Sequence, residues 1–176
     1  MTTIKKKYWI LPLCGGIISI IGLLIPVCYS TTAYDENLWM WGLIHHISSG
    51  GVFDFLPPEI LIPGLIIAVL VLIFSIVIIT FALFIIRGKD VQSRAEKIWI
   101  VMGILELCVA IIYIIAMAIG WNAYAIRMNY TVNDFWGIYN FHFGMITPFI
   151  GAALSIVGAI IGKRNNSENS ENSEIN

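Results

Sequence analysis

The apolar positions of this sequence form four long runs, and the polar residues are gathered between them. The runs cover approximately residues 8–29, 63–86, 98–121 and 143–162. About 20 apolar residues in a helix with a rise of ~1.5 Å per residue cross the hydrocarbon core of a bilayer. The pattern therefore predicts an all-α membrane protein, in which residues 1–164 form one domain with four transmembrane helices and with outer loops at 30–62 and 122–142.

The basic residues lie almost entirely on one side of this predicted bundle. They are Lys5, Lys6, Lys7, Arg87, Lys89, Arg94, Lys97, Lys163 and Arg164. Because positive charge concentrates in cytoplasmic segments, we expect both termini in the cytoplasm and a multi-pass protein of the cell membrane. Arg127 is the exception on the outside, where we expect it to pair with an outer carboxylate such as Asp134 or with a lipid headgroup.

The composition argues against a soluble protein. Apolar residues make up 59% of the chain and charged residues 12%, and the mean hydropathy is +0.86. No redox cysteine pair, phosphate-binding glycine loop, nucleophile elbow or basic nucleic-acid footprint is present in the sequence. The outer histidines, His45, His46 and His142, lack the spacing of a metal-ligand motif. We therefore expect no enzyme activity, no cofactor, no metal and no nucleic-acid partner.

The segment 165–176 repeats Ser-Glu-Asn and has almost no apolar surface to bury. This composition predicts a disordered cytoplasmic tail. It leaves open whether the tail is only a solvated terminus or binds an adaptor.

Two of the predicted helices contain stripes of small residues with helical spacing. Gly15, Ser19, Gly22 and Pro26 form one stripe, and Gly151, Ser155, Gly158 and Gly162 form the other. Small residues let helix backbones approach closely in a bilayer, so we expect both stripes to face other helices. The similar local sequences also fit an inverted repeat, but we interpret them as a shared packing solution.

Glu106 is the acidic residue within a predicted span, where an ionisable side chain costs at least ~2.5 kcal/mol on insertion scales. Its depth, counted from the cytoplasmic helix ends, resembles that of four hydroxyl side chains, Ser19, Ser75, Thr80 and Ser155. We predict an intramembrane polar layer. A neutral Glu106 that donates a hydrogen bond would be structural, whereas a proton or ion site is the alternative.

The first outer loop is rich in aromatic residues and contains a glycine turn at Gly50-Gly51. The flanking segments 38–47 and 52–56 alternate in the manner of strands, so a β-hairpin is predicted. Segments 124–132 and 135–141 of the second loop, around Asn133-Asp134, predict a second pair of strands. We expect a small β-rich cap. Its expected contact residues are Trp39, Trp41, Gly42, Leu43, Phe53, Phe55 and Trp136, although single aromatics also suit the membrane interface.

The order of these elements and the segment Trp39-Met40-Trp41-Gly42-Leu43 resemble the claudin and peripheral myelin protein group. In that family the first loop contains a Trp, then Gly-Leu-Trp, then two cysteines that form a disulfide, and the loops build a small sheet for contacts along and between membranes. Here Ile44 stands in place of the second Trp, and no cysteine follows in the loop. The resemblance therefore implies the scaffold and its contact sheet rather than a paracellular barrier.

These features predict a non-enzymatic membrane scaffold or adhesion-type protein with an aromatic extracellular contact surface. Its expected partners are membrane lipid and either further copies of the chain or another membrane protein. The alternative is a small oligomeric transporter or channel subunit that uses Glu106.

Overall fold

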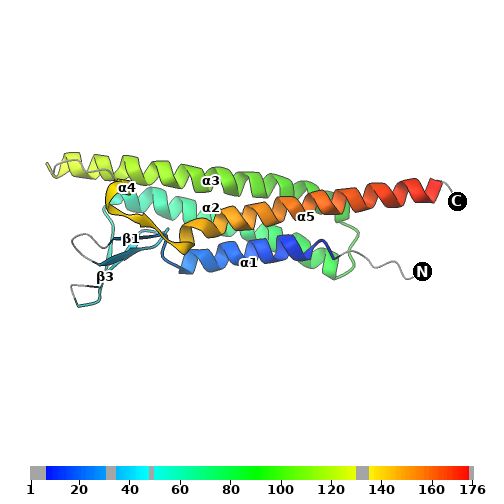
Figure 1. The fold of residues 1–176 in the computed structure, drawn as a ribbon, viewed down its shortest axis with the longest axis horizontal. Coiled ribbons are helices and arrows are strands. Elements are labelled where there is room, and N and C mark those ends of the chain that lie inside the picture. Colours follow the sequence, from blue (N-terminus) through cyan, green and yellow to red (C-terminus); the bar gives the residue numbers. More distant parts are fainter. Residues whose placement is uncertain (1–6, 31–34, 48–49, 130–134, 175–176) are drawn as a thin grey trace.

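A computed structural model describes residues 7–30, 35–47, 50–129 and 135–174. The helices are α1 Ile10–Leu24, α2 Pro58–Ile86, α3 Gln92–Arg127, α4 Phe135–Ile138 and α5 Phe143–Glu174. The strands are β1 Cys28–Ser30, β2 Glu36–Leu38, β3 Leu43–His46, β4 Val52–Phe55 and β5 Asn140–Phe141. The fold is mostly helical, with a small sheet at one end of the long helices (Figure 1).

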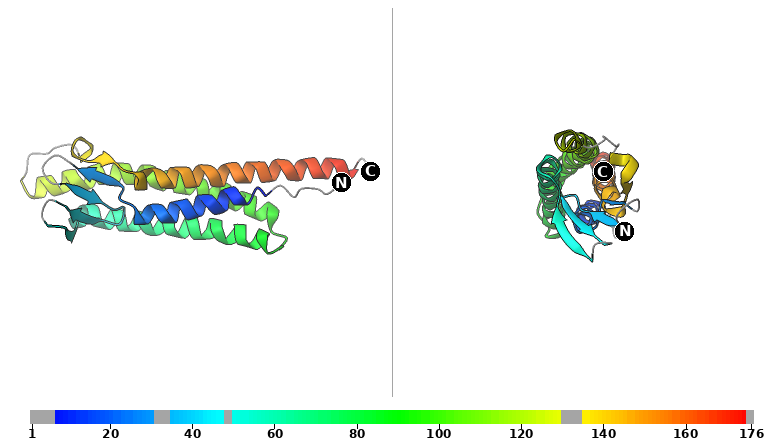
Figure 2. Two further views of the ribbon diagram at one scale, coloured as in Figure 1. Left: turned by 60° about the horizontal axis from the view of Figure 1, so that its bottom comes forward. Right: turned by 90° about the vertical axis from the view of Figure 1, so that its left-hand side faces the viewer.

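The four longer helices form a bundle. Helix α1 packs against α2 and α5, and α3 packs against the same two helices (Figure 2). Ile66, Ile112 and Ile160 are about half exposed on its outside, which suits a lipid-facing surface. The start of α1, the α2–α3 connection and the end of α5 share one end of the molecule, and the sheet lies at the other (Figure 1).

Among the described residues, three helices are long and apolar enough to cross a membrane: Pro58–Ile86, Gln92–Arg127 and Phe143–Asn165 of α5. Helix α1 is shorter than the predicted run 8–29, with 15 residues or about 22 Å at ~1.5 Å per residue. The cause is Pro26, because the residue before a proline is disfavoured in helical conformation. Ile25 is extended, with φ −101° and ψ 141°, and the chain enters β1 at Cys28.

The other helices are longer than the apolar runs. Helix α2 starts at Pro58, where a proline at the first helical position loses no helical hydrogen bond. Helix α3 extends about six residues beyond both predicted ends and stops before Asn129, whose φ of +55° is a left-handed helix-ending conformation. The backbone of α5 is helical to Glu174, through the segment 165–174, for which the sequence predicts disorder.

The sheet has five antiparallel strands in the order β4-β3-β2-β1-β5. The predicted β3–β4 hairpin is confirmed, and Gly50 and Gly51 take φ values of +86° and +77°, which glycine adopts at little cost. The predicted strand pair of the second outer loop is wrong. Residues 124–127 continue α3 and 135–138 form α4, so the strand that the described part of this loop supplies is β5. The predicted turn at 133–134 lies outside the described residues.

The two faces of the sheet differ in burial because side chains alternate along each strand. The inner face contains the cross-strand rows Cys28–Leu38–Ile44 and Ser30–Glu36–His46, and the outer face contains the row Tyr29–Asn37–His45–Phe53. The first inner row is buried, whereas Tyr29 and Phe53 are exposed. The inner face packs toward the outer end of α3, which provides the second layer that a small sheet needs.

Candidate functional site at the outer cap

The turn between β2 and β3 joins the sheet to the bundle. The indole N–H groups of Trp39 and Trp41 donate hydrogen bonds of 3.0 Å to the carbonyl oxygens of Leu24 and Leu23, respectively. These are among the last carbonyls of α1, which have no partner within their own helix. The two tryptophans therefore cap α1 from a distant part of the sequence.

The same turn packs against α2. Gly42 has a φ of +87°, and a Cβ there would lie 2.5 Å from Leu61 Cδ1. A Cβ at Gly64 of α2 would lie 2.6 Å from the Met40 carbonyl oxygen. The predicted strand 38–47 is shorter at its start: Trp39 and Trp41 lie in the turn, because β2 ends before them and β3 starts after them.

A pocket of about 320 Å³ lies between the inner face of the sheet and the outer ends of α2, α3 and α4. Both polar and aromatic side chains line it. The lining residues are Ser30, Glu36, Ile44, His46, Leu56, Pro57, Trp121, Tyr124, Ile138 and Tyr139. Volumes from about 300 Å³ upward are typical of small-molecule sites.

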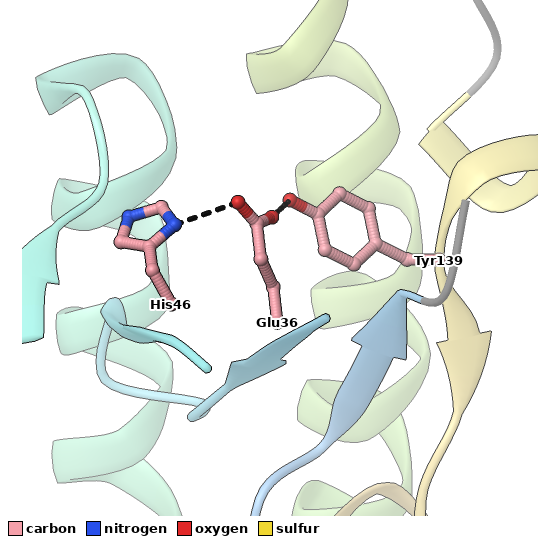
Figure 3. A network of polar contacts seen from close by, with 3 residues as sticks. All are labelled: Glu36, His46 and Tyr139. Atoms are coloured by element: carbon pink, nitrogen blue, oxygen red, sulfur yellow. Dashed lines mark hydrogen bonds and ion pairs between the residues drawn. The ribbon is translucent and has the colours of Figure 1, made fainter. Parts of the chain in front are cut away.

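Glu36 is the centre of a polar network in this pocket. Its Oε1 lies 2.7 Å from His46 Nδ1, and the Tyr139 hydroxyl donates to its Oε2 at 2.7 Å, so the carboxylate lies between the other two side chains (Figure 3). Burial, together with the hydrogen bond to Glu36, holds the pKa of Tyr139 well above its usual value. The phenol therefore remains a proton donor at neutral pH.

Aromatic rings form the opposite wall. The ring of Trp121 lies 5.9 Å from that of Tyr124 and 6.2 Å from that of Tyr139, between centroids. Arg127 lies next to this wall, with its guanidinium carbon 5.6 Å from the centroid of Tyr124. Arg127 Nε is 2.8 Å from Glu59 Oε1. Arg127 thus pairs with a carboxylate, as predicted, and the partner is Glu59; Asp134 lies outside the described residues.

The sequence reasoning missed this network. Glu36, His46 and Tyr139 belong to different segments, and Glu36 is separated from Tyr139 by 103 positions. The available signal was the alternation of the strands, which places Glu36 and His46 on one face once their register is known. The position of Tyr139 depends on how the second loop packs, and no local pattern shows it.

The predicted intramembrane layer is only partly assembled. Ser19, Ser75, Glu106 and Ser155 are fully buried. The hydroxyls of Ser19 and Ser75 lie beside the Glu106 carboxyl group. Among the described residues, however, neither carboxyl oxygen of Glu106 has a hydrogen-bond partner of acceptable geometry.

Three hydroxyls of this layer donate to carbonyls of their own helices. Ser75 donates to the Val71 carbonyl at 2.8 Å, and Ser155 donates to the Gly151 carbonyl at 2.9 Å. Thr80 is partly exposed and donates to the carbonyl of Ile76 at 2.7 Å. The structure therefore brings Ser19 and Ser75 to Glu106 and leaves Thr80 outside the cluster.

The small-residue stripes lie between α1 and α5. A Cβ at Gly15 would be 2.5 Å from the Gly151 carbonyl oxygen, and one at Gly151 would collide with the Ser19 hydroxyl. The other predicted packing glycines also face side chains of the partner helix. Gly22 faces Thr147, Gly158 faces Pro12, and Gly162 faces Tyr8 just before α1.

The predicted contact residues lie in different environments. Phe53 and Phe55 of β4 are 58% and 60% exposed. Leu43 is half-buried and pairs with Phe55 across the β3–β4 ladder. Trp136 is also half-buried, and its indole N–H donates to the Ile114 carbonyl of α3 at 3.2 Å. Phe53 and Phe55 are therefore the most exposed of the predicted set.

Among the described residues there is no group of three or more His, Cys, Asp or Glu side chains that could hold a metal ion. No protein-family model matches the chain, and no curated protein is significantly similar to it.

Proposed function

We propose that the chain crosses the cell membrane four times, with both termini in the cytoplasm. The described basic side chains Lys7, Arg87, Lys89, Arg94 and Lys97 lie at the α1-start end of the bundle, opposite the sheet, and such residues favour the cytoplasmic side. Although α1 is short, aromatic residues flank both of its ends, and neighbouring helices pack against it. Local thinning of the bilayer and snorkelling of the flanking residues accommodate such a mismatch at modest cost.

In this topology the sheet is extracellular, and the protein acts as a non-enzymatic scaffold or adhesion-type protein of claudin-like design. The observation that supports this function best is the outer face of the sheet. There Phe53 and Phe55 are more than half exposed, and the Phe53 ring stacks on His45 with 4.3 Å between centroids. Exposed aromatic surface is enriched at protein interfaces. Strands from both outer loops in one sheet also agree with the claudin-like resemblance.

Substitutions on the two faces of β4 test this function. The double change of Phe53→Ser and Phe55→Ser is expected to abolish association between copies, measured by energy transfer between labelled chains and by adhesion of expressing cells. Val52→Ser is the matched control, because Val52 is 54% exposed on the same strand but points to the other face. If both variants associate as strongly as the unmodified protein does, the proposed contact surface has no basis.

The topology has its own test. In a chain whose native cysteines Cys14, Cys28 and Cys108 are replaced, Asp54→Cys is expected to react with a membrane-impermeant maleimide on intact cells. Lys89→Cys is expected to react only after permeabilisation. Labelling of both positions from the same side would contradict the four-span arrangement.

A second candidate function is an oligomeric transporter or channel subunit. It is favoured by Glu106, a fully buried carboxyl group without a hydrogen-bond partner among the described residues, because intramembrane acidic groups often mark proton or ion paths. Proton flux into liposomes that contain the protein distinguishes the candidates. Flux that Glu106→Gln abolishes would support transport, whereas absence of flux would favour the scaffold.

A further inference from the structure

The pocket behind the sheet combines one carboxylate with several aromatic rings. Glu36 has 12% of its side-chain surface exposed, so it is mostly removed from water while remaining on the pocket wall. His46 and Tyr139 each occupy one of its oxygens. A carboxylate has about four lone-pair sites, so each oxygen retains the capacity to accept a further donor.

The charges around the pocket favour a positively charged ligand. Among the described residues, no Lys or Arg belongs to its lining. Arg127, the basic residue of the outer end, is paired with Glu59, while Asp35 and Asp54 add negative charge to the described part of the cap. A negative potential of this kind attracts cations and disfavours anions.

The aromatic wall narrows the chemical class of the ligand. Trp121, Tyr124 and Tyr139 line the pocket together, and the electron-rich faces of such rings attract ammonium groups, as in sites for choline and methylated lysine. The volume of about 320 Å³ suits a small group rather than a long chain.

We propose that this pocket binds a small alkylammonium group, with the Glu36 carboxylate as its counter-ion and the rings of Trp121, Tyr124 and Tyr139 as its walls. The inner face of the sheet forms this site, so it is separate from the outer face that is assigned to partner contacts. The ammonium group belongs either to a free amine or to the headgroup of a lipid in the outer leaflet.

Calorimetric titration of the full-length protein in a neutral detergent tests the proposal. Choline is expected to bind, and its uncharged isostere 3,3-dimethylbutan-1-ol is expected to bind at least roughly tenfold more weakly, because it lacks the charge that the site recognises. Equal binding of both molecules would show a merely apolar pocket and overturn the proposal. No binding of choline to the folded protein would also overturn it.

Variants then locate the site. Glu36→Gln keeps the shape of the side chain and is expected to weaken choline binding by about tenfold or more, because a charge-assisted contact is lost. Asp54→Asn, the matched control, removes a carboxylate outside the pocket lining and is expected to leave the affinity within about twofold. If both variants weaken binding equally, general surface charge is responsible and the assignment is wrong.

Tyr124→Leu provides a second variant in case Glu36→Gln does not fold. It removes part of the aromatic wall and is expected to weaken choline binding several-fold. An unchanged affinity would show that the aromatic wall does not contact the ligand.

Measurements in nanodiscs identify the source of the ligand. If choline binds more weakly in phosphatidylcholine nanodiscs than in phosphatidylglycerol nanodiscs, the lipid headgroup competes for the site and is its ligand. Equal choline affinity in the two kinds of nanodisc indicates a free amine.

Discussion

Replacing Gly15 by alanine places a methyl group where the backbone of α5 lies. The added Cβ would be 2.5 Å from the Gly151 carbonyl oxygen, 3.0 Å from Ser155 Oγ and 3.2 Å from Leu154 Cβ. Weak carbon–oxygen contacts are comfortable at about 3.3 Å, so the two helices would have to separate by roughly 0.8 Å. A carbonyl oxygen of a helix cannot rotate away as a side chain can.

The expected cost of Gly15→Ala follows from two opposing effects. Overpacking costs about 1 to 3 kcal/mol, and the better helix propensity of alanine returns about 0.5 to 1 kcal/mol. We therefore expect a net destabilisation of up to about 2.5 kcal/mol, measured by unfolding in mixed detergent and sodium dodecyl sulfate micelles with circular dichroism.

Ile17→Ala is the matched control for this prediction. Ile17 lies on the same helix and is 42% exposed on the outside of the bundle, so its truncation should change the stability less, since lipid or detergent covers that surface. If Gly15→Ala unfolds at the same dodecyl sulfate fraction as the unmodified protein, α1 and α5 are not in backbone contact at this position.

Three further predictions concern polar contacts. Trp41→Phe should destabilise the protein by about 1 to 2 kcal/mol, because a carbonyl at the end of α1 loses its donor. Trp39→Phe should destabilise it less, because the hydrogen bond of Trp39 is more exposed. Equal melting temperatures for both variants and the unmodified protein would disprove the capping role. Tyr139→Phe should cost about 1.5 to 3 kcal/mol, since a buried hydrogen bond to a carboxylate is lost, and unchanged chemical unfolding would contradict this. Because the pKa of Tyr139 is higher in the folded protein, its stabilising contribution is complete below the pKa of the unfolded chain, near 10.0, and declines as the pH rises above that value. If an ultraviolet titration shows that Tyr139→Phe removes an ionisation near pH 10, the pKa of Tyr139 is not raised. Glu106→Gln should retain the fold within about 1 kcal/mol, because an amide can replace a neutral carboxyl group in size and hydrogen bonding, and failure to fold would show that the carboxyl group itself is required.

The helices were predictable to the extent that they depend on the length of an apolar run. Helices α2, α3 and α5 all contain their predicted spans, because about 20 apolar residues bury their backbone polar groups best as a helix. The boundaries were less predictable. Pro26 shortened α1, a local effect that the sequence displays. The extension of α3 to Arg127 brings that residue to Glu59 of α2 and ends just before Asn129, whose conformation terminates helices.

The candidate site was predictable only in fragments. The glycine pair and the alternating aromatics predicted the β3–β4 hairpin, because turn chemistry and side-chain alternation are local properties. The sequence predicts Trp39 and Trp41 as contact residues, but it does not indicate that they donate hydrogen bonds to the end of α1. Their hydrogen bonds join residues 15 and 18 positions apart in sequence, and the intervening β1 and β2 determine whether they can form.

The sequence by itself determined the apolar character of the chain, the three long apolar helices, the small-residue stripes and the hairpin, because each depends on the composition or spacing of neighbouring residues. Only the tertiary structure decided which side chains meet at the outer cap. Glu36 reaches Tyr139 across 103 positions because four strands of the first loop and one of the second share a sheet against α3. Such a contact depends on how the elements pack, and hydrophobic periodicity does not encode it.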